Sequence, residues 1–297
     1  MSLSQAADGL SWSVRRRLEF VEFRLYWEGR VNRGDLTGTF GISVPQASLD
    51  LALYQRLAPK NLAYDKSAKT YVSAEKFRPL FRKPNAGAYL TLLRSVSAGA
   101  ISPHDAWLGR IPEFQAVPAP PRAEDPDLLR RSLKAIREKQ ALRIHYQSMS
   151  RPQPEWRWIS PHAVGFDGFR PHLRALCHRD RTFKDFVLTR ILEIDGVGPG
   201  EAATEHDGEW NEVVKFRIGP NPKLDVGQRR AIELDYGMNR GRIEFEVRIA
   251  LAYYARRQLG LDHPPASDPR QYPVVLLNPK EVEAAHAKAG LGETIKT

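Results

Sequence analysis

The chain has 297 residues, 42% of them hydrophobic and 27% charged, with 45 Lys and Arg against 35 Asp and Glu. This length predicts two domains or three small ones, and the composition excludes a wholly disordered, collagenous or coiled-coil chain. A single cysteine, Cys177, excludes an intramolecular disulfide framework and a multi-cysteine zinc site. No apolar run approaches 18 residues, and the N-terminus lacks the apolar core of a signal peptide. We therefore expect no membrane contact and a reducing compartment, the cytoplasm.

The basic excess lies in the front two-thirds of the chain. Residues 1–85 hold 14 basic and 8 acidic side chains, and residues 86–198 hold 17 and 12. Residues 199–297 hold 14 and 15. This asymmetry favours a polyanion as the partner of the first two segments.

The first 85 residues carry the pattern of a winged helix-turn-helix. Residues 14–27 place apolar side chains at helical spacing. Asn32 is a favourable N-cap for a short helix that ends at Gly41, and Ser43 is a favourable N-cap for a third helix. Residues 61–73 alternate around a polar turn and predict a β-hairpin. This order of elements is typical of a DNA-binding winged helix.

The third helix is expected to enter the major groove, where polar side chains near its start reach base edges. Gln46 can pair bidentately with adenine, and Ser43 and Ser48 can donate or accept hydrogen bonds. The alternative is that Gln46 and Ser48 are solvated residues of the helix surface that contact no base. Basic side chains nearby are candidate phosphate contacts, which position the protein without reading sequence. They are Arg15, Arg16, Arg17, Arg33, Arg56, Lys60, Lys66 and Lys69.

The middle segment predicts a helix capped by Asp127, followed by four alternating, strand-like runs. One helix and several antiparallel strands favour a small, strongly bent sheet or open barrel. Separated motifs in this segment resemble the WYL domain, an Sm-like β-barrel of bacterial transcription regulators. They are Tyr146-Gln-Ser148, Arg157-Trp-Ile-Ser-Pro161-His162, Gly168-Phe-Arg-Pro-His172-Leu173-Arg174-Ala and Phe186-Val-Leu-Thr-Arg190-Ile. The triplet Trp-Tyr-Leu that names the domain is Pro171-His172-Leu173 here, so aromatic stacking there is lost while His172 can still hydrogen-bond.

Polar and basic side chains of the WYL-like segment predict a site for an anionic effector, such as a nucleotide or nucleic-acid fragment. Guanidinium groups match phosphate oxygens bidentately, and His and Ser supply adaptable donors. The alternative is internal pairing, for example of Arg190 with Asp185 or Glu193. Arg174 in that case braces the rim of the barrel. The candidate ligand-binding residues are Tyr146, Ser148, Arg157, His162, His172, Arg174, Lys184 and Arg190.

No catalytic constellation stands out in the sequence. The chain lacks the phosphate-binding loop, the nucleophile-elbow and the zinc-protease motifs, and its histidines have no metal-ligand spacing. Cys177 and His178 are adjacent on a predicted strand and so point to opposite faces, which favours a buried structural thiol. We expect neither enzymatic activity nor a cofactor or metal.

The arrangement as a whole resembles the BrxR and CapW regulators of phage-defence islands, the BREX and CBASS loci. The string ISVPQASLDLALYQRLAPKNLAYDKSAKTYV, the WYL motifs and the C-terminal extension carry this resemblance. It implies a homodimeric repressor that binds a palindromic operator, with a WYL pocket whose ligand relieves repression. An accessory nucleic-acid-binding module that regulates a defence nuclease or helicase, without transcriptional control, is the alternative.

The predicted fold class is α+β and multidomain, comprising a winged helix-turn-helix, an Sm-like WYL β-barrel and a C-terminal α/β extension. Prolines at 111–126 and glycines with acidic residues at 195–209 indicate loops between segments. The expected segments are a DNA-binding domain at 1–85, a helical connector and linker at 86–126, a ligand-sensing domain at 127–198 and a dimerisation extension at 199–297.

Overall fold

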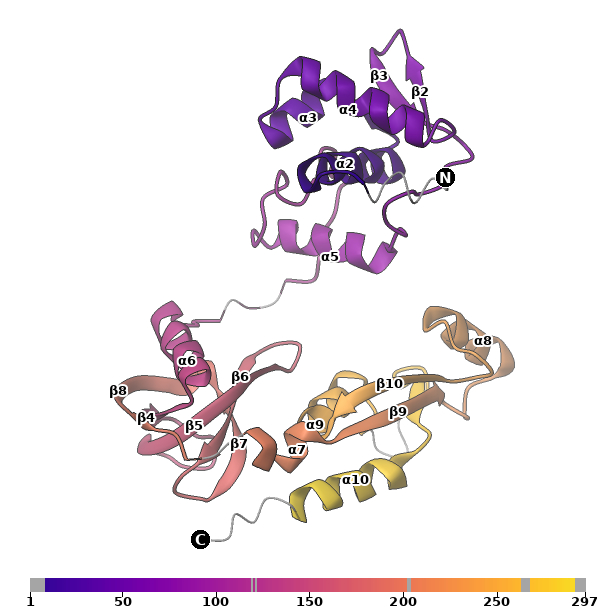
Figure 1. Cartoon of the computed structure of the whole chain (residues 1–297). Helices are drawn as coiled ribbons and strands as arrows, with labels where there is room; N and C mark the ends of the chain where they lie inside the picture. Colours follow the sequence, from indigo (N-terminus) through magenta and orange to yellow (C-terminus); the bar gives the residue numbers. More distant parts are fainter. Residues whose placement is uncertain (1–8, 119, 121, 202–203, 263–267, 292–297) are drawn as a thin grey trace. The chain divides into compact units, whose positions relative to one another are not determined.

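The computed structural model describes residues 9–118, 120, 122–201, 204–262 and 268–291. The chain divides into two compact units, Met1–Pro118 and Ala119–Thr297, which are described separately below (Figure 1). None of the helices in the described residues is both long enough and apolar enough to span a bilayer.

The first unit contains the predicted winged helix-turn-helix. A long helix, α2, lies between the α3–α4 pair and α5 (Figure 1). A small antiparallel sheet in the order β1-β3-β2 forms the wing. The elements are α2 (Trp12–Glu28), β1 (Arg30–Val31), α3 (Arg33–Phe40), α4 (Val44–Leu57), β2 (Leu62–Asp65), β3 (Thr70–Ser73) and α5 (Ala86–Ser97).

Local capping signals set the starts of α3 and α4, as the sequence predicts. Asn32 and Asp35 form a reciprocal capping box at the start of α3. The Ser43 hydroxyl accepts a hydrogen bond from the Gln46 N–H at 3.3 Å. Gly41, with φ of 63°, ends α3 in the left-handed conformation that glycine adopts without strain.

The core of this unit lies between α2 and α4. Phe20, Leu25, Leu51 and Tyr54 have no exposed surface, and burial of each such side chain stabilises the fold by roughly 1.5–3 kcal/mol. The Tyr54 hydroxyl donates to the Glu22 carboxylate at 3.1 Å and accepts from the Asn61 amide at 3.1 Å. Glu22 and Asn61 thus join α2, α4 and the start of the wing.

The segment predicted as a helical connector packs in part on the first unit. Leu93 of α5, with Ala106 and Leu108 of the following loop, forms a small buried cluster. Phe23 of α2 and Tyr89 of α5 pack against this cluster.

The WYL-like segment is a helix packed on a five-stranded antiparallel sheet in the order β7-β6-β5-β4-β8. Leu128, Leu129 and Ile136 of the helix pack against the apolar face of the sheet. Register shifts in β4 and β5 mark β-bulges, which bend the sheet. The elements are α6 (Pro126–Glu138), β4 (Gln140–Tyr146), β5 (Glu155–Phe166), β6 (Pro171–Cys177), β7 (Thr182–Val187), η1 (Leu188–Arg190) and β8 (Ile191–Pro199).

Two details of this domain differ from expectation. The described strands β7 and β8 pair with β6 and β4 but not with each other, so the sheet is open and no closed barrel forms. Helix α6 is capped by Asp125, not by Asp127 as predicted. The Asp125 carboxylate accepts from the Asp127 N–H at 2.8 Å, and Pro126 occupies the first turn, where its missing N–H costs little.

The C-terminal extension is an α+β module around a three-stranded antiparallel sheet in the order β10-β9-β11. Its core includes Phe216, Ile218 and Val274, all at most 1% exposed. The elements are η2 (Thr204–His206), α7 (Gly208–Asn211), β9 (Val213–Pro220), α8 (Val226–Asp235), β10 (Ile243–Arg248), α9 (Ile249–Gln258), β11 (Val274–Leu276) and α10 (Pro279–Leu291).

Candidate DNA-binding surface and effector pocket

Helix α4 presents a mixed polar and apolar face outside its buried side. Ser43 and Val44 are exposed at its start, and Gln46 and Ser48 are half-buried. The Ser48 hydroxyl donates to the Val44 carbonyl at 2.9 Å, which leaves its oxygen lone pairs as acceptors. Leu49 is 64% exposed. Our sequence analysis considered only polar readers and missed Leu49, although an exposed apolar side chain can contact a thymine methyl.

A buried ion pair fixes α4 on α2. Arg17 donates to both carboxylate oxygens of Asp50, from Nε at 2.6 Å and from Nη2 at 3.2 Å. Gln46 Nε2 donates to the same carboxylate at 3.0 Å, so the amide has a defined orientation and keeps its oxygen free. Arg17 is only 9% exposed. The prediction of Arg17 as a phosphate contact is therefore wrong, because its guanidinium is buried and paired with Asp50 inside the unit.

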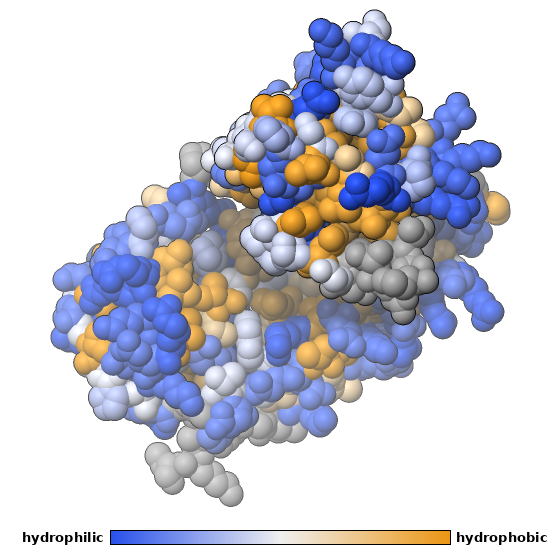
Figure 2. All heavy atoms as spheres, turned by 45° about the horizontal axis from the view of Figure 1, so that its top comes forward, coloured by the Kyte–Doolittle hydropathy of each residue, from blue (hydrophilic) through white to orange (hydrophobic). Residues whose placement is uncertain are grey.

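The other candidate phosphate contacts fall into two groups. Arg15 and Arg16 lie beside Glu19, at 3.3 and 4.0 Å, and Arg16 also stacks over the Trp107 ring, 4.0 Å from its centroid. The second group consists of exposed side chains that make no ion pair with any described residue. The second group is Arg33, Arg56, Lys60, Lys66 and Lys69. Figure 2 shows that hydrophilic residues cover the tip of the wing at the top of the unit.

Five of the eight predicted effector residues line one cavity of about 370 Å³ in the WYL domain. Arg157 is 8% exposed, and its Nε is buried without a hydrogen-bond partner. Arg190 makes no ion pair with any described residue, in contrast to the alternative pairing considered above. Arg179 also lines the cavity, though the sequence analysis missed it because it lies in the turn after β6. The five are Tyr146, Ser148, Arg157, Lys184 and Arg190.

The other three predicted effector residues lie away from this cavity and bind acidic side chains. Arg174 donates to both carboxylate oxygens of Asp207, at 2.7 and 2.9 Å. His162 Nε2 lies 2.8 Å from Asp207, and His172 Nε2 lies 3.0 Å from Asp167. The eight residues therefore do not form one site. Arg157 and Lys184, which line the cavity, also have acidic partners, Glu155 at 3.3 Å and Asp180 at 2.7 Å.

Arg174 connects the WYL sheet to the C-terminal extension. Besides Asp207, it reaches Glu209 at 2.9 Å and Asp185 at 3.5 Å. Burial raises the pKa of Asp207, but the hydrogen bonds from Arg174 and His162 outweigh it and hold that pKa at about 2. Burial raises the pKa of Asp185, opposed by the charge of Arg174 and the hydrogen bond from Tyr254.

Three family models match consecutive parts of the chain. The model described as the BrxR transcriptional regulator winged helix-turn-helix domain matches residues 13–95. The WYL domain matches residues 127–195. The BrxR transcriptional regulator C-terminal dimerization domain matches residues 213–282.

Curated relatives align over nearly the whole chain. The DNA-binding transcriptional repressor CapW of Stenotrophomonas maltophilia is 39% identical over 282 residues, 94% of each chain. CapW of Escherichia coli (strain KTE188) is 40% identical over 278 residues, 93% of each chain. A solved structure, proteasome accessory factor B/C of Arthrobacter aurescens, is 18% identical and covers 95% of this chain and 49% of that chain. The TM-score of this match is 0.25. The extent and identity of the CapW matches show that this chain belongs to the BrxR and CapW family of winged-helix, WYL-domain transcriptional regulators.

Proposed function

We propose that this protein is a homodimeric transcriptional repressor that binds a palindromic operator and controls a phage-defence operon. The observation that carries the proposal is the geometry of α4. Its Gln46 amide is oriented by Asp50. Exposed basic side chains that make no ion pair with a described residue lie on α3, on α4 and in the turn of the wing. Membership of a family whose relatives are named DNA-binding repressors, and a match to a dimerization domain, support the same conclusion.

A two-fold dimer would place two α4 helices in successive major grooves, so half-sites are expected about 10–10.5 base pairs apart, or a multiple of that distance. The test is a gel shift with the DNA upstream of the protein's own gene. A sequence-specific complex that survives moderate salt is expected. Equal binding to scrambled duplex, or tighter binding to single strands, contradicts operator recognition and favours the accessory-module alternative.

Base reading and phosphate binding are separable by two substitutions. Gln46→Ala is expected to lower affinity for the operator by about tenfold or more, equivalent to one lost base contact, with little effect on scrambled DNA. Lys66→Ala is expected to weaken binding to both DNAs alike and to reduce the salt slope by about one. The measurement is a salt series of gel shifts with each variant. Identical profiles for the two variants would contradict these roles.

We further propose that the WYL cavity binds an anionic effector, a nucleotide or nucleic-acid fragment. Donors for a phosphate group come from Arg157 Nε, which has no hydrogen-bond partner among the described residues, and from the Arg190 guanidinium, which makes no ion pair with them. Asp185 lines the same cavity and accepts a hydrogen bond from the Tyr254 hydroxyl of α9 at 3.1 Å. A bound anion near Asp185 favours its protonated form, which weakens its attraction to Arg174. The signal would thereby reach the C-terminal extension.

Arg190→Gln is expected to weaken effector binding by roughly tenfold while operator affinity without effector is unchanged, because the guanidinium holds no structural partner among the described residues. The measurement is calorimetric titration with a panel of mononucleotides and short oligonucleotides. Arg137→Gln is the matched control, since Arg137 is exposed on α6 and does not line the cavity. Equal loss in both variants would contradict the assignment.

A further inference from the structure

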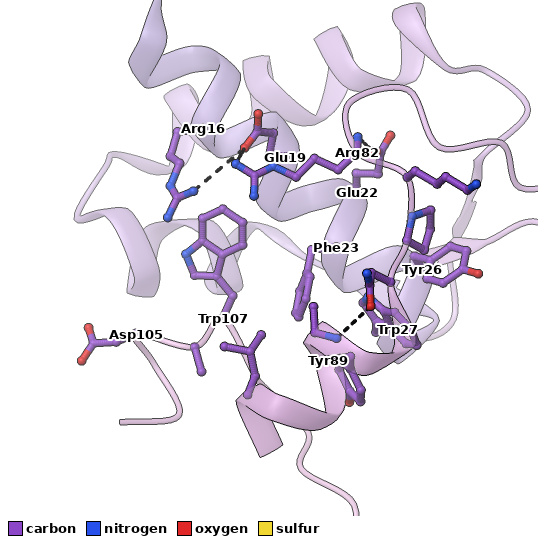
Figure 3. Close-up of a pocket in the computed structure, with 16 residues that line it drawn as sticks. Arg16, Glu19, Glu22, Phe23, Tyr26, Trp27, Arg82, Tyr89, Asp105 and Trp107 are labelled. Atoms are coloured by element: carbon purple, nitrogen blue, oxygen red, sulfur yellow. Dashed lines mark hydrogen bonds and ion pairs between the residues drawn. The ribbon is translucent and has the colours of Figure 1, made fainter. Parts of the chain in front are cut away.

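A second cavity, of about 380 Å³, lies in the first unit between α2, α5 and the loop that carries Trp107 (Figure 3). None of its lining residues belongs to α4 or to the second unit. Its volume falls within the range of small-molecule sites, roughly 300–1,000 Å³. Of its lining residues, Arg16 alone is among the candidate phosphate contacts.

Aromatic side chains from three segments form its wall. Phe23 of α2 and Trp107 of the loop lie 6.0 Å apart between ring centroids. Trp27 of α2 stacks on Tyr89 of α5 at 4.3 Å. In Figure 3, Phe23 and Trp107 border the same space, with Arg16 and Arg82 above them. Such a wall offers flat, polarizable surface to an aromatic ring.

Two carboxylates of α2 hold the edges of the cavity in place. Glu22 accepts hydrogen bonds from the backbone N–H groups of Leu80, Phe81 and Arg82, at 2.6 to 3.1 Å. One turn or more further along α2, Glu28 accepts from the Gly109 N–H at 2.8 Å. Because both flanking segments are tied to one helix, the cavity is formed before any ligand arrives.

Trp107 has a backbone conformation that a bulky residue rarely adopts. Its φ is 62°, in the left-handed region, which is unfavourable for such a residue unless its surroundings hold it there. This conformation places the indole beneath the Arg16 guanidinium, 4.0 Å from the ring centroid. Strained residues of this kind concentrate at ligand sites.

The charges at the mouth favour an acidic group on the ligand. The Glu22 carboxylate is satisfied by the Tyr54 hydroxyl and three backbone donors. Glu19 is paired with Arg82 at 3.2 Å and with Arg16 at 4.0 Å. Asp105, which also lines the cavity, lies 3.7 Å from His104 Nδ1. Lys83 lines the cavity, is exposed and makes no ion pair with any described residue. Among the described cations that line the cavity, Lys83 is therefore the one without an ion-pair partner.

We propose that this cavity binds a flat aromatic molecule that carries one acidic group, its rings against Phe23 and Trp107 and its acid at Lys83. The site is additional to the effector cavity of the WYL domain and lies on the helix that supports α4.

Two fluorescent dyes with the same ring system test the proposal on the full-length protein. The probes are 8-anilino-1-naphthalenesulfonate and its uncharged analogue N-phenyl-1-naphthylamine. Both are expected to bind saturably to the cavity. Lys83→Gln is expected to weaken binding of the sulfonate by about three- to tenfold, as loss of one charge-assisted contact implies, and to leave the uncharged dye unchanged.

Two alanines of α5 provide a matched pair of variants. Ala88 lines the cavity and Ala86 does not, and both are exposed. Ala88→Phe fills the cavity and is expected to weaken both dyes by about tenfold or more, whereas Ala86→Phe leaves them within about twofold. If Ala88→Phe does not fold, as judged by circular dichroism, Ala88→Leu replaces it with the same expected direction.

Three results would overturn the proposal. The first is absence of saturable dye binding, which is also the result expected if a second copy of the chain covers the cavity. The second is equal dye affinity in the Ala88 and Ala86 variants, which places the dye elsewhere. The third is an unchanged sulfonate affinity in Lys83→Gln, which removes the acidic group from the ligand.

Discussion

Replacing Asp207 by alanine is expected to lower the free energy of unfolding of the second unit by about 3–5 kcal/mol, because removal of one partner strands a buried charge. Arg174, 3% exposed, would lose two of its hydrogen bonds, and His162 would lose its acceptor. The measurement is urea unfolding of the full chain followed by circular dichroism. The effect would reach the WYL sheet and the C-terminal extension together, since Asp207 joins them.

The matched control is Asp195→Ala, which breaks an ion pair with Arg143 in which both side chains are at least 31% exposed. Exposed pairs contribute about 0–1 kcal/mol. A loss for Asp207→Ala as small as that for Asp195→Ala would show that the buried pair does not stabilise the junction.

The Asp207 contribution also depends on pH. The folded pKa of Asp207, about 2, lies below its ordinary value of 3.8. A depressed folded pKa means that the stabilisation is complete above about pH 4 and is lost as the pH falls towards 2. At 1.36 kcal/mol per pKa unit, the loss amounts to about 2 kcal/mol. The stability gap between wild type and Asp207→Ala is therefore expected to narrow over that interval.

Asp50→Ala is expected to have an effect of similar size in the first unit, about 3–5 kcal/mol. Arg17 would keep its charge at 9% exposure without its bidentate partner, and Gln46 would lose the acceptor that orients its amide. Operator affinity is therefore expected to fall by about tenfold or more even at low temperature, where the variant stays folded. Unfolding and gel shifts on the same protein sample measure both effects.

Asp50→Asn and Asp105→Ala are the controls for this position. Asp50→Asn keeps the shape of the side chain and one acceptor oxygen. Its free energy of unfolding and its operator affinity should therefore lie between those of Asp50→Ala and wild type. Asp105 has a side chain 71% exposed, and its removal should leave the free energy of unfolding almost unchanged. Stability of Asp50→Ala equal to that of Asp105→Ala would contradict a structural role for the Arg17–Asp50 pair.

Features that depend on neighbouring residues were predictable from the sequence. Asn32 and Ser43 cap their helices because the cap and the capped N–H groups lie within three residues of one another. The buried face of α4, with Ala47, Leu51 and Tyr54, follows from helical spacing. The wing follows from alternation around a polar turn.

Features that depend on distant residues were not predictable in this way. Arg174 lies 33 residues from Asp207, and Arg17 lies 33 residues from Asp50. Nothing local to an arginine distinguishes one that will bind phosphate from one that will be neutralised across the core. For this reason the eight predicted effector residues fall into two groups, five that line the WYL cavity and three that lie beside carboxylates elsewhere. His162 likewise lies 45 residues from its partner Asp207, whereas His172 lies 3.0 Å from Asp167, in the turn just before its own strand.

The shared carboxylate of Glu22 limits how the first unit can evolve. It satisfies Tyr54 and three backbone donors at once, while Asn61 contacts the same tyrosine hydroxyl. Substitutions at positions 22, 54 and 61 should therefore combine non-additively, since each removes a partner that the others need. Relatives are expected to replace these three residues in concert or to retain all of them, while the exposed residues of α4 diverge freely with the DNA sequences that they recognise.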